Sequence, residues 1–191
     1  MLEAVDYFIN TDCEKYIQLV IITELAENDL DHYIRSLKDG NIREEDLKVI
    51  LAQMVIGLSY LHLKQEISHR DFKPQNILMF PGLRIKISDF GLAKTTDTSK
   101  ASMTVCGTLM FMAPELLKLV RGAKPERFKP DIYSFAATAI WMILKIIPDT
   151  EDIIDRTIVF PSEYSQDLKD FIYFCLIRRP HLRPTIADIA K

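Results

Sequence analysis

Residues with complementary chemistry crowd into the stretch HRDFKPQN, residues 69–76. Asp71 is followed there by Lys73 and Asn76, and another acid, Asp89, comes eighteen positions after Asp71. An acid can accept a proton, and an amide and a carboxylate supply the oxygen ligands that Mg²⁺ prefers. A lysine can reach a phosphate as a point charge. The set suits phosphoryl transfer from a nucleotide, although any one of these residues alone would more often form a turn or a helix cap.

The composition fits one globular domain, or one lobe of a larger domain. The chain has 191 residues, of which 48% are hydrophobic, and this is enough for a substantial core. Its net charge is −3 and its basic residues are scattered, which argues against a nucleic-acid partner. The longest apolar run, residues 135–147, is too short for a membrane span and contains Lys145.

The number and spacing of the cysteines bear on the cellular compartment. Cys13, Cys106 and Cys175 are odd in number, far apart and outside any CxxC pattern, so we expect reduced thiols and no structural zinc. The first ten residues lack the basic and apolar pattern of a signal peptide. Both observations favour an intracellular, cytoplasmic location.

Two pairs of strands are predicted around the polar set, the first from β-rich composition and the second from hydrophobic alternation. Two β-rich runs, residues 5–10 and 16–25, predict a pair of strands. Residues 76–80 and 84–88 alternate around the turn PGL, which predicts a small hairpin directly after the polar stretch. Residues 92–113 show no period and predict a long loop.

Helices are predicted where apolar residues recur at helical spacing. The clearest helix covers residues 44–63, and a shorter one precedes it with Asn28 as its cap and Gly40 as its stop. The apolar run at 131–147 predicts a helix that is buried on nearly all sides. Further helices are expected at 114–120, at 165–177 and from 185 onward, where Thr185 and Asp188 can form a capping box.

These motifs resemble the eukaryotic protein kinase family. HRDFKPQN and DFG, residues 89–91, are similar to its catalytic loop and magnesium loop, and GTLMFMAPE, residues 107–115, is similar to the end of its activation segment. DIYSFA at 131–136 resembles the start of its central buried helix, and RPT at 183–185 resembles a late helix junction. The resemblance covers essentially the whole chain.

The resemblance implies roles for the polar set, with ATP and Mg²⁺ as cofactors. Asp71 would accept the proton of the substrate hydroxyl, and Lys73 would steady the γ-phosphate. Asn76 and Asp89 would hold the cation. Lys73 in the pattern KPxN is typical of Ser/Thr kinases, and Thr108 agrees with that assignment.

The resemblance also implies an adenine site and a regulatory site. Glu24 and Ala26 would offer hinge backbone to adenine, and Leu78 would pack below the base.

In the regulatory site, Arg70 and Lys94 would bind an activating phosphate on Thr104, added by another kinase. Ser99 and Ser102 are alternative acceptors of that phosphate.

The remaining matches imply structural contacts. Glu115 and Arg183 would form a buried ion pair across the helical lobe. Asp131 would hydrogen-bond the backbone of the catalytic loop. His69 would pack against Phe90 instead of titrating.

We therefore expect an α+β fold in which residues 27–191 form a mostly helical kinase C-lobe with small β-hairpins. Residues 1–26 would be a remnant of the N-lobe sheet together with the hinge. Neither a GxGxxG loop nor a VAIK-type strand lysine occurs before the hinge in the sequence.

Two functions from different classes fit. The first is a Ser/Thr kinase, a fragment of a longer enzyme, that transfers the γ-phosphate of ATP to protein Ser/Thr hydroxyls. The second is a kinase-derived binding or scaffold module without turnover. The intact polar set favours the first function, and the missing glycine loop favours the second. We expect weak or undetectable turnover from these 191 residues alone.

Overall fold

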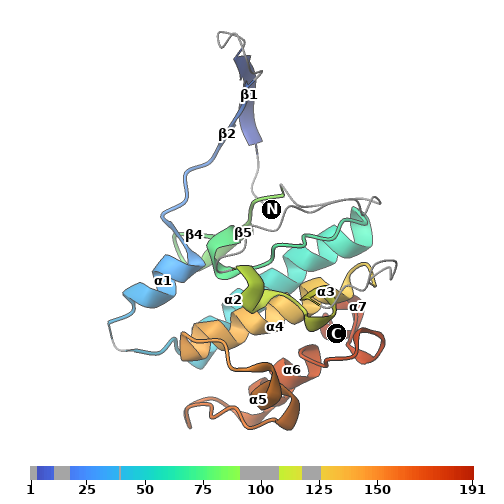
Figure 1. Ribbon diagram of the computed structural model, residues 1–191. Helices are drawn as coiled ribbons and strands as arrows, with labels where there is room; N and C mark the ends of the chain where they lie inside the picture. The colour runs from blue at the N-terminus through green and yellow to red at the C-terminus, as the bar shows by residue number, and fades with distance from the viewer. Residues whose placement is uncertain (1–3, 11–17, 39, 91–107, 118–125) are drawn as a thin grey trace.

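The computed structural model describes residues 4–10, 18–38, 40–90, 108–117 and 126–191. A body of helices carries a β-hairpin that projects away from it (Figure 1). The fold is α+β and mostly helical with small antiparallel sheets, as the sequence predicts.

The projecting hairpin pairs strand β1 (Ala4–Asn10) with strand β2 (Gln18–Thr23), which confirms the first predicted strand pair. Tyr7 lies opposite Ile21, and their exposed fractions are 69% and 56%. Such an isolated two-stranded ribbon contributes little stability of its own in water.

A second sheet lies at the polar stretch and has the order β3-β4-β5. Strands β4 (Ile77–Phe80) and β5 (Arg84–Ile87) form the predicted hairpin, and Gly82 in its turn has a φ of 74°. Strand β3 (Asn28–Asp29) was not predicted, and it pairs with β4.

Helix α1 (Leu30–Ser36) is present, but its predicted cap is wrong by one residue. Asn28 pairs with Met79 in the sheet, and the Asp29 side chain accepts from the His32 amide at 2.7 Å instead. Asp and Asn cap equally well, so residue type does not distinguish the two neighbours. Asp29 is the cap because it lies directly before Leu30, the first helical residue.

Helix α2 (Glu44–Ser59) continues into a single π-helical turn, η1 (Tyr60–Lys64), and together they match the predicted helix 44–63. Its apolar stripe packs into the core. Among the described residues, this is the helix long and apolar enough to cross a membrane. That is weak evidence for a span, because 44% of its apolar window is buried and core helices meet the same criterion.

Gly57 allows α2 to lie directly on strand β5. A Cβ atom built at Gly57 would be 2.5 Å from Cδ1 of Ile87, which is far inside van der Waals contact. The absence of a side chain therefore sets how closely the helix approaches the β4–β5 hairpin, which Asn76 precedes and Asp89 follows.

Helix α4 (Lys129–Leu144) is the centre of the body, as predicted for the apolar run. Almost every residue in it is buried, including Asp131 and Ser134. It ends at Lys145, whose φ of 58° breaks the helix, so the predicted extension to residue 147 is wrong.

The remaining elements surround α4 (Figure 1). Helices α6 (Gln166–Cys175) and α7 (Ile186–Ile189) were predicted, and the Thr185–Asp188 capping box is confirmed. Helix α5 (Thr150–Asp155) was not predicted. The other short elements are α3 (Pro114–Leu117) and the 3-10 turns η2 (Pro74–Asn76), η3 (Thr108–Phe111) and η4 (Pro180–Leu182).

Candidate active site

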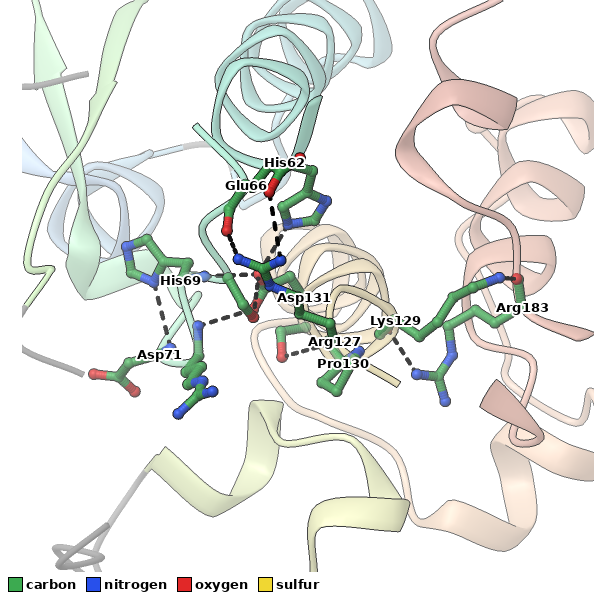
Figure 2. A network of polar contacts seen from close by, with 12 residues as sticks. His62, Glu66, His69, Asp71, Arg127, Lys129, Pro130, Asp131 and Arg183 are labelled. Atoms are coloured by element: carbon green, nitrogen blue, oxygen red, sulfur yellow. Dashed lines mark hydrogen bonds and ion pairs between the residues drawn. The ribbon is translucent and has the colours of Figure 1, made fainter. Parts of the chain in front are cut away.

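The loop between η1 and β4 carries three residues of the polar set, Asp71, Lys73 and Asn76. A buried carboxylate on α4, that of Asp131, binds the backbone of this loop. Among the described residues, Asp131 Oδ2 accepts hydrogen bonds from the amide of His69 at 2.8 Å and from Ser68 Oγ at 2.9 Å. Its other oxygen, Oδ1, accepts from the Arg70 amide at 2.9 Å. Figure 2 shows Asp131 between this loop and the end of the preceding helix. The contact expected for Asp131 is therefore present.

His62 completes the environment of Asp131. Its Nε2 lies 2.9 Å from Asp131 Oδ2, and its ring stacks on Phe128 at a centroid distance of 4.6 Å. Burial opposes ionisation of Asp131, but the hydrogen bond and charge of His62 and the amides of Arg70 and His69 outweigh it and lower the Asp131 pKa. No local sequence pattern points to His62, because it lies 69 positions from its partner.

Arg70 and Asp89 are among the described non-glycine residues that have left-handed backbone. Arg70 has a φ of 68° and Asp89 a φ of 60°. Such conformations cost a non-glycine residue about 1 to 2 kcal/mol and persist where surrounding contacts hold them. At Arg70 the holding contact is the hydrogen bond from its amide to Asp131.

His69 is a structural residue, fully buried. Its Nδ1 accepts from the Asp71 amide at 3.3 Å, so its Nε2 donates to the Ser88 carbonyl at 2.9 Å. Its ring meets the edges of Phe72 and Phe90 at centroid distances of 5.7 and 5.2 Å. The expected contact with Phe90 is present, in edge-on geometry. Both ring nitrogens are used, which leaves His69 no capacity as a general base.

The structure brings Asp71, Lys73 and Asn76 together. Lys73 Nζ lies 2.7 Å from Asp71 Oδ2, and the Asn76 amide nitrogen donates to the same oxygen at 2.9 Å. Asn76 also donates to the Asp71 main-chain carbonyl at 2.7 Å. Among the described residues, the other oxygen of Asp71, Oδ1, is buried and accepts no hydrogen bond.

Ser88 connects this loop with the loop that carries Asp89. Its amide donates to the Asn76 carbonyl at 2.9 Å, and its carbonyl accepts from His69. Asp89 follows directly and is exposed. In the described part of the chain no group of three His, Cys, Asp or Glu side chains could hold a metal ion. A cation here would use Asn76 and Asp89 together with ligands from outside the protein.

The expected adenine site lies between the hinge segment, residues 24–27, and strand β4. The Glu27 amide donates to the Met79 carbonyl at 3.0 Å, which places the hinge segment beside Leu78. Leu78 and Ala26 are half-buried. Lys86 on β5 forms an ion pair with Glu24, a contact that the sequence did not predict.

The ion pair expected between Glu115 and Arg183 is present and bidentate. Nη1 and Nη2 of Arg183 lie 2.7 and 3.0 Å from the two carboxylate oxygens of Glu115. Arg183 is fully buried and also donates to the carbonyls of Lys129 and Ile177, the first at 2.8 Å and the second at 2.9 Å. Its position beside α4 is visible in Figure 2.

The expected regulatory site and the cysteines are only partly within the described residues. Lys94 and Thr104 lie outside the described residues, as do Cys13 and Cys106. Arg70, the third member of the expected regulatory site, is half-buried. Cys175 is a free, buried thiol, and burial raises its pKa to about 12, so it is not a nucleophile near neutral pH.

Comparison with known proteins agrees with this geometry. The family described as the protein kinase domain matches residues 6–191. The chain is 31% identical over 187 residues to serine/threonine-protein kinase 36 of Pongo abelii, which covers 90% of this chain and 13% of that protein. It is 33% identical over 172 residues to developmentally-regulated protein kinase 1 of Dictyostelium discoideum, covering 85% of this chain and 23% of that one.

Serine/threonine-protein kinase 4 homolog A of Dictyostelium discoideum is 31% identical over 170 residues, which is 81% of this chain and 36% of that protein. The chain thus spans 13% to 36% of the length of these three relatives. The family match at residues 6–191 includes residues 24–27, the stretch 69–76 and the helical body. The chain belongs to the eukaryotic protein kinase family, and two of these three relatives are named as serine/threonine-protein kinases.

Proposed function

We propose that the chain transfers the γ-phosphate of ATP to Ser or Thr hydroxyls of a protein substrate, with Asp71 as the proton acceptor. The main support for this proposal is the hydrogen bonding of the two Asp71 carboxylate oxygens. Lys73 and Asn76 bind one of its oxygens, and the other is buried without a hydrogen bond among the described residues. A buried acceptor normally has a partner, so an unused one at a functional loop fits a hydroxyl that binds there.

The contacts around Asp71 also fix the orientation of the carboxylate oxygen that would accept the proton, Oδ1. Because Asn76 and Lys73 fix Oδ2, the carboxylate cannot rotate freely and Oδ1 is held in one orientation. A general base must lie within hydrogen-bond reach of the proton that it accepts, and pre-orientation reduces the entropy cost of reaching that geometry. Lys73 carries a positive charge beside the base, where a transferred phosphoryl group would also be stabilised.

The residues present fit Mg²⁺ and ATP. The Asn76 amide nitrogen is committed to Asp71, which leaves its side-chain oxygen as the group that can coordinate a cation. Asp89 supplies a carboxylate, and both are hard oxygen donors of the kind that Mg²⁺ prefers. When bound, Mg²⁺-ATP supplies the phosphoryl group and offsets its negative charge.

We also propose the division into residues 1–26, an N-lobe remnant with the hinge, and residues 27–191, the C-lobe. In the described residues the β1–β2 sheet shares no strand with the β3–β4–β5 sheet, which supports this boundary. The partners proposed are a protein substrate and a kinase that phosphorylates Thr104. Because the reaction consumes ATP, an intracellular location belongs to the same proposal.

The test is phosphoryl transfer from labelled ATP to a Ser- and Thr-containing peptide library, with and without Mg²⁺. We expect slow, Mg²⁺-dependent transfer, and we expect Asp71→Asn to reduce it by about 100-fold or more, the contribution of a general base. Asp170→Asn removes an exposed carboxylate on α6 and serves as the control. Transfer that persists in Asp71→Asn would contradict the proposed role of this residue.

A binding or scaffold module is the second candidate, because the sequence has no glycine-rich loop to cover the phosphates. This candidate predicts that ATP binds without transfer, and that Asp71→Asn leaves ATP affinity within about twofold, since a base contributes to turnover and little to binding. Equilibrium binding of ATP and the transfer assay, measured on the same preparation, distinguish the two candidates.

A further inference from the structure

Lys86 joins the hinge segment to the hairpin of the helical body. Its ammonium forms an ion pair with the Glu24 carboxylate, 62 positions away in the sequence. The side chains are partly buried, with exposed fractions of 22% for Lys86 and 30% for Glu24. Ion pairs that are partly withdrawn from water are less screened than those on the open surface.

The strand pairing fixes the direction of the Lys86 side chain. Lys86 lies directly opposite Leu78, so the two side chains are on the same face of the β4–β5 hairpin. Phe80 is on that face too, and the Lys86 ammonium lies 5.5 Å from the centroid of its ring. The lysine therefore crosses the face that carries Leu78 before it reaches the hinge.

The hinge segment is thus held at both of its ends. The Glu24 side chain binds Lys86, and the Glu27 amide donates to the Met79 carbonyl. Between them Leu25 is 94% exposed, which gives the segment little packing of its own.

We propose that Lys86 is a positioning residue for nucleotide recognition: through Glu24 it sets the separation between the hinge backbone and Leu78, the two sides of the adenine site. This inference rests on the proposed function. Lys86 touches no part of the nucleotide in this assignment. It acts by restricting where the backbone of residues 24–26 can lie.

The first measurement needs no nucleotide. Hydrogen exchange of the Glu27 amide is compared in the wild-type chain, in Lys86→Met and in the charge-swapped double variant Glu24→Lys/Lys86→Glu. We expect exchange to become about three- to fivefold faster in Lys86→Met, the factor for an ion pair near the upper end of the partly exposed range. The double variant should restore the wild-type rate.

Two controls separate positioning from general loss of stability. The Ser88 amide, bonded to the Asn76 carbonyl in the same hairpin region, should keep its exchange rate in every variant. Lys48→Met removes an exposed cation on α2 that pairs with Glu44, and it should leave Glu27 unchanged. Equal acceleration at Ser88 and Glu27, or no acceleration at Glu27 in Lys86→Met, would overturn the proposal.

The second measurement is the affinity for adenosine, which has no phosphate and so reports the adenine site alone. We expect Lys86→Met to weaken binding by the same factor of about three to five, and the charge swap to recover it. Binding that is identical in wild type and Lys86→Met would overturn this inference while leaving the proposed function intact. A wild-type chain that binds neither adenosine nor ATP would overturn the proposed function itself.

Discussion

Replacing Asp131 by asparagine should uncouple the catalytic loop from helix α4. The carboxylate is 1% exposed and accepts from His62, Ser68 and His69 on Oδ2 and from Arg70 on Oδ1. Asparagine keeps one acceptor and introduces an NH₂ group. Whichever way the amide is turned, its NH₂ faces at least one buried N–H donor, and no rotation of the side chain removes this conflict.

Loss of these contacts lowers the free energy of unfolding of Asp131→Asn in three ways. If the amide oxygen takes the side with three donors, the Arg70 amide loses its acceptor, and a buried orphaned donor costs about 1 to 3 kcal/mol. The three bonds that remain lose their charge assistance, and such bonds are about twice as strong as neutral ones. The left-handed backbone of Arg70 also loses its main restraint. We expect a total loss of about 3 to 5 kcal/mol, against about 5 to 15 kcal/mol for a whole domain.

Urea unfolding of Asp131→Asn measures this loss, with Asp170→Asn on the exposed face of α6 as the matched control. The control should stay within about 0.5 kcal/mol of wild type. Hydrogen exchange at His69 and Arg70 locates the effect, since these amides donate directly to Asp131. A loss below about 1 kcal/mol, the net worth of a single neutral hydrogen bond, would refute the claim that Asp131 organises the loop.

Three other predictions test the rest of the structure. Glu115→Ala leaves the Arg183 guanidinium buried without its partner and should cost about 3 to 5 kcal/mol in urea unfolding; a loss near zero would contradict a buried pair. Gly57→Ala should push Ile87 aside and lower stability by about 1 to 3 kcal/mol. Ile87→Val removes the clashing Cδ1 atom, so the double variant should be less destabilised than the two single changes added together. Hydrogen bonds from Lys48 and Ser165 lower the Glu44 pKa to about 2, so the contact of α2 with Ser165 should persist above the unfolded pKa of about 4.3 and weaken as pH falls towards 2. The protection factor of the Ser165 amide, its exchange rate relative to the intrinsic rate at each pH, measures this, and a pH-independent protection factor would contradict it.

Elements with local signals could be predicted from the residues alone. The apolar stripe of residues 44–63 and the alternation of residues 76–88 depend on side chains a few positions apart, and both predicted the observed elements. The capping box at Thr185 is visible for the same reason. The set Asp71, Lys73 and Asn76 could be found because six consecutive positions of one loop hold all three.

Tertiary structure decided everything that depends on distant partners. His62 near Asp131 and Lys86 near Glu24 have no sequence signal, because each pair is more than 60 positions apart and only the folded chain brings it together. Asp29 rather than Asn28 caps α1, because the folded helix begins at Leu30, directly after Asp29. The left-handed backbone of Arg70 likewise follows from a carboxylate on another element. Residue types along the chain decide which chemistry is possible. Packing around α4 decides how those groups are oriented, because a buried polar atom needs a hydrogen-bond partner and the fold determines which partners are near.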